Sequence, residues 1–145
     1  MKYSQKTEYA IHSLLFLALV RKVTLVEEIA DKLEVPASYL AKVMQQLTRE
    51  GLAKSYKGPN GGYMLARTAE EITLGEIVRI FERKEMVMDC FYEDRNCSLW
   101  PRCLILEKLD EAFEDMLTEL ENVTIEDIIE STEKFKELRR DLNIS

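Results

Sequence analysis

The chain has 145 residues, of which 46% are hydrophobic and 32% charged, and its formal net charge is −7. This length fits one domain, or a small domain with an appendage, and the hydrophobic content is sufficient for a core. The apolar run over residues 11–20 reaches only about half of the roughly 20 residues that a membrane span needs, and no small-residue cleavage site follows it. We therefore expect a cytoplasmic protein without a membrane segment.

The charge is divided unevenly along the chain. Residues 1–67 contain 10 lysines and arginines against 6 acidic residues, a net charge of +4. Residues 68–145 contain 10 against 21, a net charge of −11. This asymmetry places any polyanionic partner on the first half of the chain.

The first part of the chain predicts three helices. Ser4 is a candidate N-cap for a helix that continues through the teens. Residues 24–27 form a capping-box pattern that opens a short helix to about Leu33. Pro36 stands at the first turn of a third helix, which stops at Gly51. Two short helices joined by a tight turn are typical of a helix-turn-helix unit, although two ordinary packing helices would leave the same pattern.

The third helix begins with small and hydrogen-bonding side chains, which can approach phosphates and base edges closely. We predict that Ser38, Tyr39 and Lys42 lie at the DNA groove. Residues 52–57 and 63–65 then alternate as strands around a glycine-rich loop, which indicates a β-hairpin. A hairpin directly after such a helix is the wing of a winged helix-turn-helix domain. Its candidate DNA-binding residues are Lys57, Gly58, Asn60 and Gly61.

The sequence thus predicts a mainly α fold with a small β-hairpin wing, in which residues 1–83 form the DNA-binding domain. Residues 73–76 are a further capping-box start, for a helix to about residue 83. A long helix over 103–122 has apolar residues at alternating three- and four-residue steps, which favours a dimerisation helix, with packing inside one chain as the alternative. The members of this seam are Leu106, Leu109, Phe113, Met116 and Leu120.

We assign residues 104–130 to the dimerisation helix and a short helix opened by a capping box at 124–127. Residues 131–145 form a charged tail, which we expect to be helical but poorly anchored.

The loop at 84–103 holds all three cysteines of the chain, Cys90, Cys97 and Cys103, spaced C-x6-C-x5-C. An odd number of thiols in a reducing compartment points to metal or redox chemistry. His12 is the only histidine and lies one helical turn after Glu8, so the two side chains share a face. A zinc site, metal-free thiols and a plain surface pair of Glu8 and His12 remain alternatives. Zinc sites usually contain close C-x2-4-C pairs, which are lacking here. No nucleophile signature surrounds a cysteine or the histidine, so we do not expect an enzyme.

The order of these parts resembles the Rrf2 family of bacterial winged-helix transcription regulators, which includes IscR-, NsrR- and RsrR-like proteins. The resemblance covers roughly residues 1–130. It implies a homodimeric repressor or activator that binds an inverted-repeat DNA site and senses redox, iron–sulfur or nitric oxide status through an iron–sulfur cluster. A metal-carrying redox or scaffold protein, with the winged helix used for protein contacts, is the alternative. The matching segments are residues 1–6, 36–42, 57–63 and 72–77, the cysteine loop and residues 123–128.

The resemblance implies two ligand sets. Cys90, Cys97 and Cys103 occupy the cluster-loop positions, whereas the histidine that IscR-like members use shortly after the third cysteine is absent. NsrR-like members use a carboxylate where this chain has Glu8, which with three cysteines would suit a [4Fe–4S] cluster. RsrR-like members use a glutamate, a histidine and the last two cysteines, here Glu8, His12, Cys97 and Cys103. We favour this second set and a [2Fe–2S] cluster, because it explains the single histidine.

Overall fold

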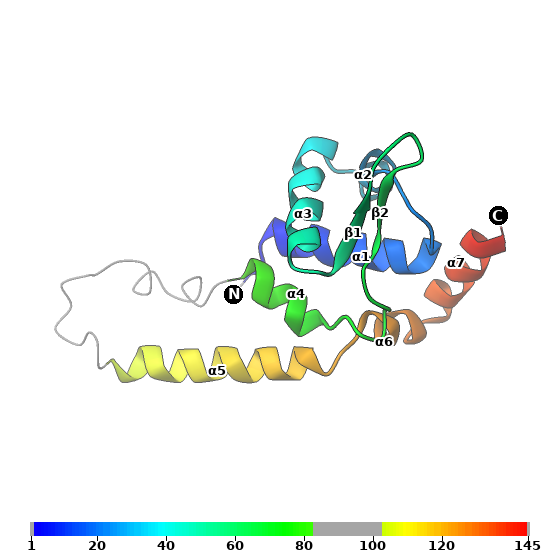
Figure 1. The fold of residues 1–145 in the computed structure, drawn as a ribbon. Helices are drawn as coiled ribbons and strands as arrows, with labels where there is room; N and C mark the ends of the chain where they lie inside the picture. The colour runs from blue at the N-terminus through cyan, green and yellow to red at the C-terminus, as the bar shows by residue number, and fades with distance from the viewer. Residues whose placement is uncertain (1, 83–102, 145) are drawn as a thin grey trace.

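The structure, a computed structural model, describes residues 2–82 and 103–144 (Figure 1). It is mostly helical with one small antiparallel hairpin, as the sequence predicts. The helix bounds in chain order are α1 Gln5–Val20, α2 Val26–Leu33, α3 Ala37–Arg49, α4 Leu74–Phe81, α5 Leu104–Glu121, α6 Ile125–Glu130 and α7 Glu133–Ile144. The strands between α3 and α4 are β1 Ala53–Tyr56 and β2 Gly62–Leu65.

The main core forms around α1, which lies between α2 and α3 on one side and the C-terminal helices α6 and α7 on the other (Figure 1). Leu14 of α1 is fully buried, and so are Leu40 and Leu47 of α3 and Ile77 of α4. Ile129 of α6 joins the same cluster. Because burying one such side chain contributes about 1.5–3 kcal/mol, these contacts hold α3, α4 and α6 on α1.

Short-range capping signals predict most helix starts correctly. Ser4 caps α1, and its hydroxyl accepts a hydrogen bond from the N–H of Thr7. Thr73 caps α4 in the same way. At α6 both halves of the capping box form, between Thr124 and Asp127. These hydrogen bonds satisfy N–H groups that have no partner inside the helix.

The capping box predicted over residues 24–27 is wrong, although the helix exists. The N-cap of α2 is Leu25, which has no side-chain cap. Thr24 instead forms a β-bridge with Tyr63, with N···O distances of 2.9 and 2.8 Å. Thr24 is therefore held in an extended conformation by strand β2 and does not cap α2. Gly62 makes the approach possible, because a Cβ there would lie 2.4 Å from the carbonyl oxygen of Thr24.

The apolar residues of α5 fall into two groups, one buried within the chain and one accessible to solvent. Leu106 and Phe113 are buried within the single chain, as is Leu117, which the seam omitted. Phe113 and Leu117 pack on Val78 of α4. Part of the predicted dimer seam is therefore intrachain packing. A second strip, offset around the helix, stays accessible, with Ile105 59% exposed and Leu109 partly exposed.

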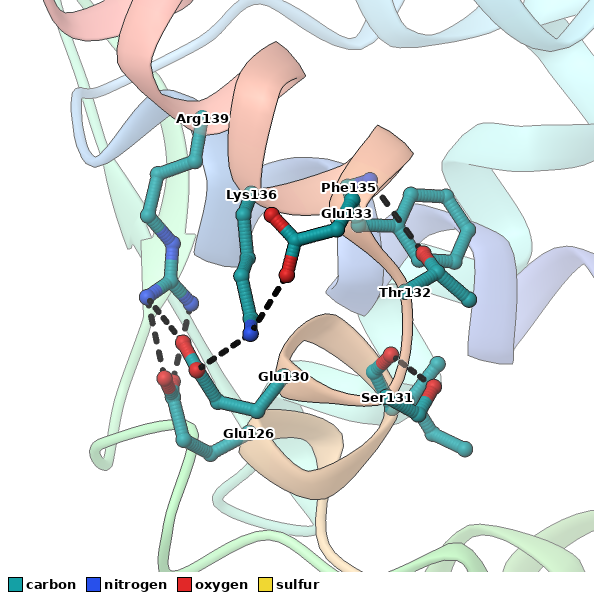
Figure 2. A network of polar contacts seen from close by, with 9 residues as sticks. Glu126, Glu130, Ser131, Thr132, Glu133, Phe135, Lys136 and Arg139 are labelled. Carbon is teal, nitrogen blue, oxygen red and sulfur yellow. Dashed lines mark hydrogen bonds and ion pairs between the residues drawn. The ribbon is translucent and has the colours of Figure 1, made fainter.

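The charged tail is helical as predicted, but the expectation of poor anchoring is wrong. Helix α7 packs on α1, and Phe135 contacts the main core. Figure 2 shows the polar contacts that join α7 to α6. Arg139 donates two hydrogen bonds of 2.9 Å to the carboxylate of Glu126, while Lys136 lies between Glu130 and Glu133.

The Arg139–Glu126 pair makes stability depend on pH. Hydrogen bonds from Arg139 lower the pKa of Glu126 below its usual 4.5 despite partial burial. A lowered folded-state pKa adds stability above the unfolded pKa, and this stability is lost as the pH falls through the folded value. We expect Glu126→Gln to cost about 1–2 kcal/mol at pH 7 and less at an acidic pH below the folded-state pKa of Glu126, both measured by urea unfolding. The control, Glu111→Gln, removes an exposed i,i+3 pair with Lys108 and should change neither value. An equal loss at both pH values would contradict the role of charge.

Candidate nucleic-acid interface and cluster site

Helix α3 presents one polar face to solvent and one apolar face to the core. Ser38 and Lys42 are exposed, as predicted, and Gln45 and Arg49 continue the same exposed stripe. The four positions are spaced by four, three and four residues, which places them along one side of a helix. The opposite face, Leu40, Val43, Met44 and Leu47, is buried. The groove residues predicted from the sequence ended at Lys42 and did not include Gln45 and Arg49. The same helical periodicity could have identified both.

Tyr39 has a different position from its two predicted neighbours. Its side chain is partly buried, and its ring meets the ring of Tyr9 edge to face, with centroids 5.5 Å apart and planes at 87°. Aromatic pairs prefer this geometry. Tyr39 therefore connects α3 to α1 at the point where Ser38 and Lys42 face outward.

A groove runs between the exposed face of α3 and the hairpin. Gln45, Thr48 and Arg49 line it from α3, and Ser55 and Tyr63 line it from the strands; its volume is about 450 Å³. These side chains are hydroxyls, an amide and a guanidinium, all of which can bind phosphate or base edges.

The hairpin tip exposes Lys57, Gly58 and Asn60, three of the four predicted wing residues. Gly61, the fourth, is buried in the turn. A Cβ at Gly61 would lie 2.4 Å from the carbonyl oxygen of Tyr56. Gly61 thus shapes the turn, while Lys57 and Asn60 present the polar groups at the tip.

The structure does not bring Cys103 together with Glu8 and His12. Glu8 and His12 are both exposed on α1. Cys103 is partly exposed at the N-cap of α5, whose N-terminal end extends away from α1 in Figure 1. Cys90 and Cys97 lie outside the described residues. Within the described ranges, no group of three or more His, Cys, Asp or Glu side chains is close enough to hold a metal ion, so one chain does not gather Glu8, His12 and Cys103.

The donor types nevertheless fit an iron–sulfur cluster. Thiolates hold such clusters, and imidazole can replace a thiolate on one iron. Glu8 and His12 are one turn apart on α1, and their side chains make no hydrogen bond or ion pair with residues 2–82 or 103–144. Their donor atoms are therefore not used by the described part of the fold.

An exposed polar helix beside a glycine-tipped hairpin defines a winged helix-turn-helix protein. Residues 3–131 match the model of the Rrf2 family, described as iron-dependent transcriptional regulator. The chain belongs to this family and is a transcriptional regulator of the Rrf2 type.

Individual relatives agree with this assignment. The HTH-type transcriptional regulator NsrR of Shouchella clausii is 36% identical over 132 residues, which cover 89% of each chain. Among solved structures, T. potens IscR is similar with a TM-score of 0.70 at 24% identity, covering 92% of this chain and 90% of its own. CymR (YrzC), the global cysteine regulator of B. subtilis, is similar with a TM-score of 0.66 at 27% identity, covering 92% and 99%. No helix in the described residues is long and apolar enough to cross a membrane.

Proposed function

We propose that this Rrf2-type regulator binds an inverted-repeat duplex as a symmetric homodimer. The observation that carries the proposal is the exposed stripe on α3, with Ser38, Lys42, Gln45 and Arg49 beside the wing. A helix with such a face can enter the major groove while the wing follows the sugar–phosphate backbone. In this arrangement Ser38 and Gln45 contact base edges, whereas Lys57 and the glycine tip contact phosphates. In a dimer with two-fold symmetry, the two α3 helices are related to each other in the same way as the two halves of an inverted repeat.

We further propose that an iron–sulfur cluster controls DNA affinity. Cys97, Cys103, Glu8 and His12 would hold a [2Fe–2S] cluster, with [4Fe–4S] on the three cysteines and Glu8 as the alternative. The separation of Cys103 from Glu8 and His12 within one chain supports a site shared between subunits, in which the loop of one chain meets α1 of the other. The family description and the NsrR relative support an iron-based sensor.

The cluster, when bound, supplies a change of charge by one-electron transfer. The protein residues convert that change into a difference in DNA binding. His12 would hold the cluster through one of its two ring nitrogens. Tyr9 lies beside Glu8 on α1 and contacts Tyr39 of α3, so a shift of α1 reaches the start of the reading helix. Only a different interaction free energy in the two DNA-binding geometries can move their equilibrium.

DNA binding is tested with duplexes from the promoter region of the protein's own gene. We expect Lys57→Ala to weaken binding to every duplex alike and to reduce the salt slope by about one, because a phosphate contact carries no sequence information. Lys134→Ala, on the exposed side of α7, is the charge-matched control and should leave both quantities unchanged. An unchanged slope in Lys57→Ala removes Lys57 from the interface. If the wild type shifts no duplex at low salt, with or without cluster, the DNA-binding proposal fails.

A further inference from the structure

A buried carboxyl group joins the start of α1 to the end of α4. Glu82 directly follows α4 and is only 7% exposed. Its Oε1 accepts a hydrogen bond of 2.6 Å from the N–H of Ser4 and a second one from the hydroxyl of Thr7. Thr7 is fully buried. Ser4 and Thr7 also contact each other through their hydroxyls, at 3.1 Å. We call this group of Ser4, Thr7 and Glu82 the carboxyl clamp.

The clamp is more specific than ordinary core packing. A carboxyl group buried this deeply is unfavourable unless hydrogen bonds compensate it, and an apolar side chain would fill the space at less cost. The two donors are the N–H of Ser4, the N-cap of α1, and the hydroxyl of Thr7 in its first turn, at the positive end of the helix dipole. The side chain of Glu82 therefore holds α1 in a defined direction, whereas apolar contacts alone permit sliding.

The last turn of α4 also contacts α3, the helix proposed to enter the major groove. The backbone of Glu82 is held by its own helix, with its N–H donating to the carbonyl of Val78 at 2.8 Å. The side-chain amide of Gln46 in α3 donates to the carbonyl of Ile80 at 3.4 Å. On its other side α4 packs on α5 through Val78. The end of α4 thus connects α1 and α3 to α5.

We propose that Glu82 is a positioning residue for DNA binding, which sets the orientation of the reading helices relative to α5 by fixing the first turn of α1 to the last turn of α4. This inference rests on the proposed function, because it requires a dimer in which α5 joins two DNA-binding domains. With the clamp intact, the two α3 helices keep the separation that an inverted repeat requires. Without the clamp, each α3 helix still recognises its half-site, but the distance between the two α3 helices is no longer fixed.

The test compares duplexes carrying two half-sites with duplexes carrying one. We expect Glu82→Met, which removes both acceptor oxygens at similar side-chain length, and Thr7→Val to weaken binding to the full site about tenfold, within the usual range of coupling between sites. Affinity for the single half-site should stay within about twofold of wild type, because α3 and the wing are untouched. The variants should also discriminate less against a full site whose half-sites are one base pair further apart. Thr7→Ser keeps the hydroxyl and should restore wild-type values.

Ile129→Val controls for a general loss of stability. Ile129 is fully buried in the core but has no part in the clamp, so this variant should leave the ratio of full-site to half-site affinity unchanged. Equal weakening of both duplexes by Glu82→Met, or no change in either, overturns the inference and leaves the proposed function standing. A wild type that binds neither duplex overturns both, and that failure is visible before any variant is made.

Discussion

Replacing Ile105 and Leu109 with glutamate is expected to convert the proposed dimer to a monomer in solution. The two residues are one turn apart on α5, and Ile105 is 59% exposed beside Leu104, which is 69% exposed. Neither residue belongs to the cluster in which Phe113 and Leu117 pack on Val78 of α4. Because burying a charge in an apolar interface costs several kcal/mol, two introduced carboxylates should abolish association. Light scattering measures the change in mass.

The control for this prediction is Thr118→Glu, which adds the same charge to an exposed position on the other side of α5. It should remain dimeric. Phe113→Glu, which the sequence alone would suggest, is less suitable, because Phe113 is buried against Val78 and the variant would detach α5 from α4. A monomeric wild type, or a double variant that stays dimeric, would remove this strip from the interface.

Removal of one cluster ligand is expected to abolish iron binding entirely. After anaerobic purification we expect two irons and two sulfides per site and a visible absorption spectrum. Cys97→Ala, Cys103→Ala, His12→Ala and Glu8→Ala should lose all three signals, whereas Cys90→Ala should keep them. Glu27→Ala, on the exposed side of α2, is the control for Glu8→Ala. Iron and sulfide assays with native mass spectrometry provide the measurement.

Mixed dimers test whether the site is shared between subunits. One chain carries His12→Ala and the other Cys97→Ala. If the loop of one chain meets α1 of the other, one of the two sites in a mixed dimer combines intact ligands, and about half of the iron returns. If each chain builds its own site, no iron binds.

Other outcomes would change the cofactor assignment. Four irons, with Cys90 essential and His12→Ala harmless, indicate a [4Fe–4S] cluster with Glu8 as the ligand other than cysteine. A colourless protein with stoichiometric zinc excludes the cluster. A metal-free protein with intact DNA binding would favour a cysteine-related signal, as in the name of the B. subtilis neighbour CymR.

The sequence by itself determined the local structure, because the relevant interactions span only a few residues. Ser4, Thr73 and Thr124 cap helices since each hydroxyl meets an N–H three residues later. The inward face of α3 follows from helical periodicity. The hairpin follows from its glycines, of which Gly58 has a φ of 101° that other residues adopt at a cost.

Tertiary structure decided what each of these elements contacts, since that depends on residues far apart in the chain. Thr24 has a good capping sequence, yet pairing with Tyr63 takes its backbone into a bridge. The heptad pattern of α5 shows an apolar helix but does not say which side meets α4. Arg139 anchors the tail only because α6 brings Glu126 to it. Glu82 looks like one more surface glutamate in the sequence, and it is buried because the first turn of α1 folds back onto it. In all four cases a long-range partner outweighs a local preference or supplies a contact that no local pattern encodes.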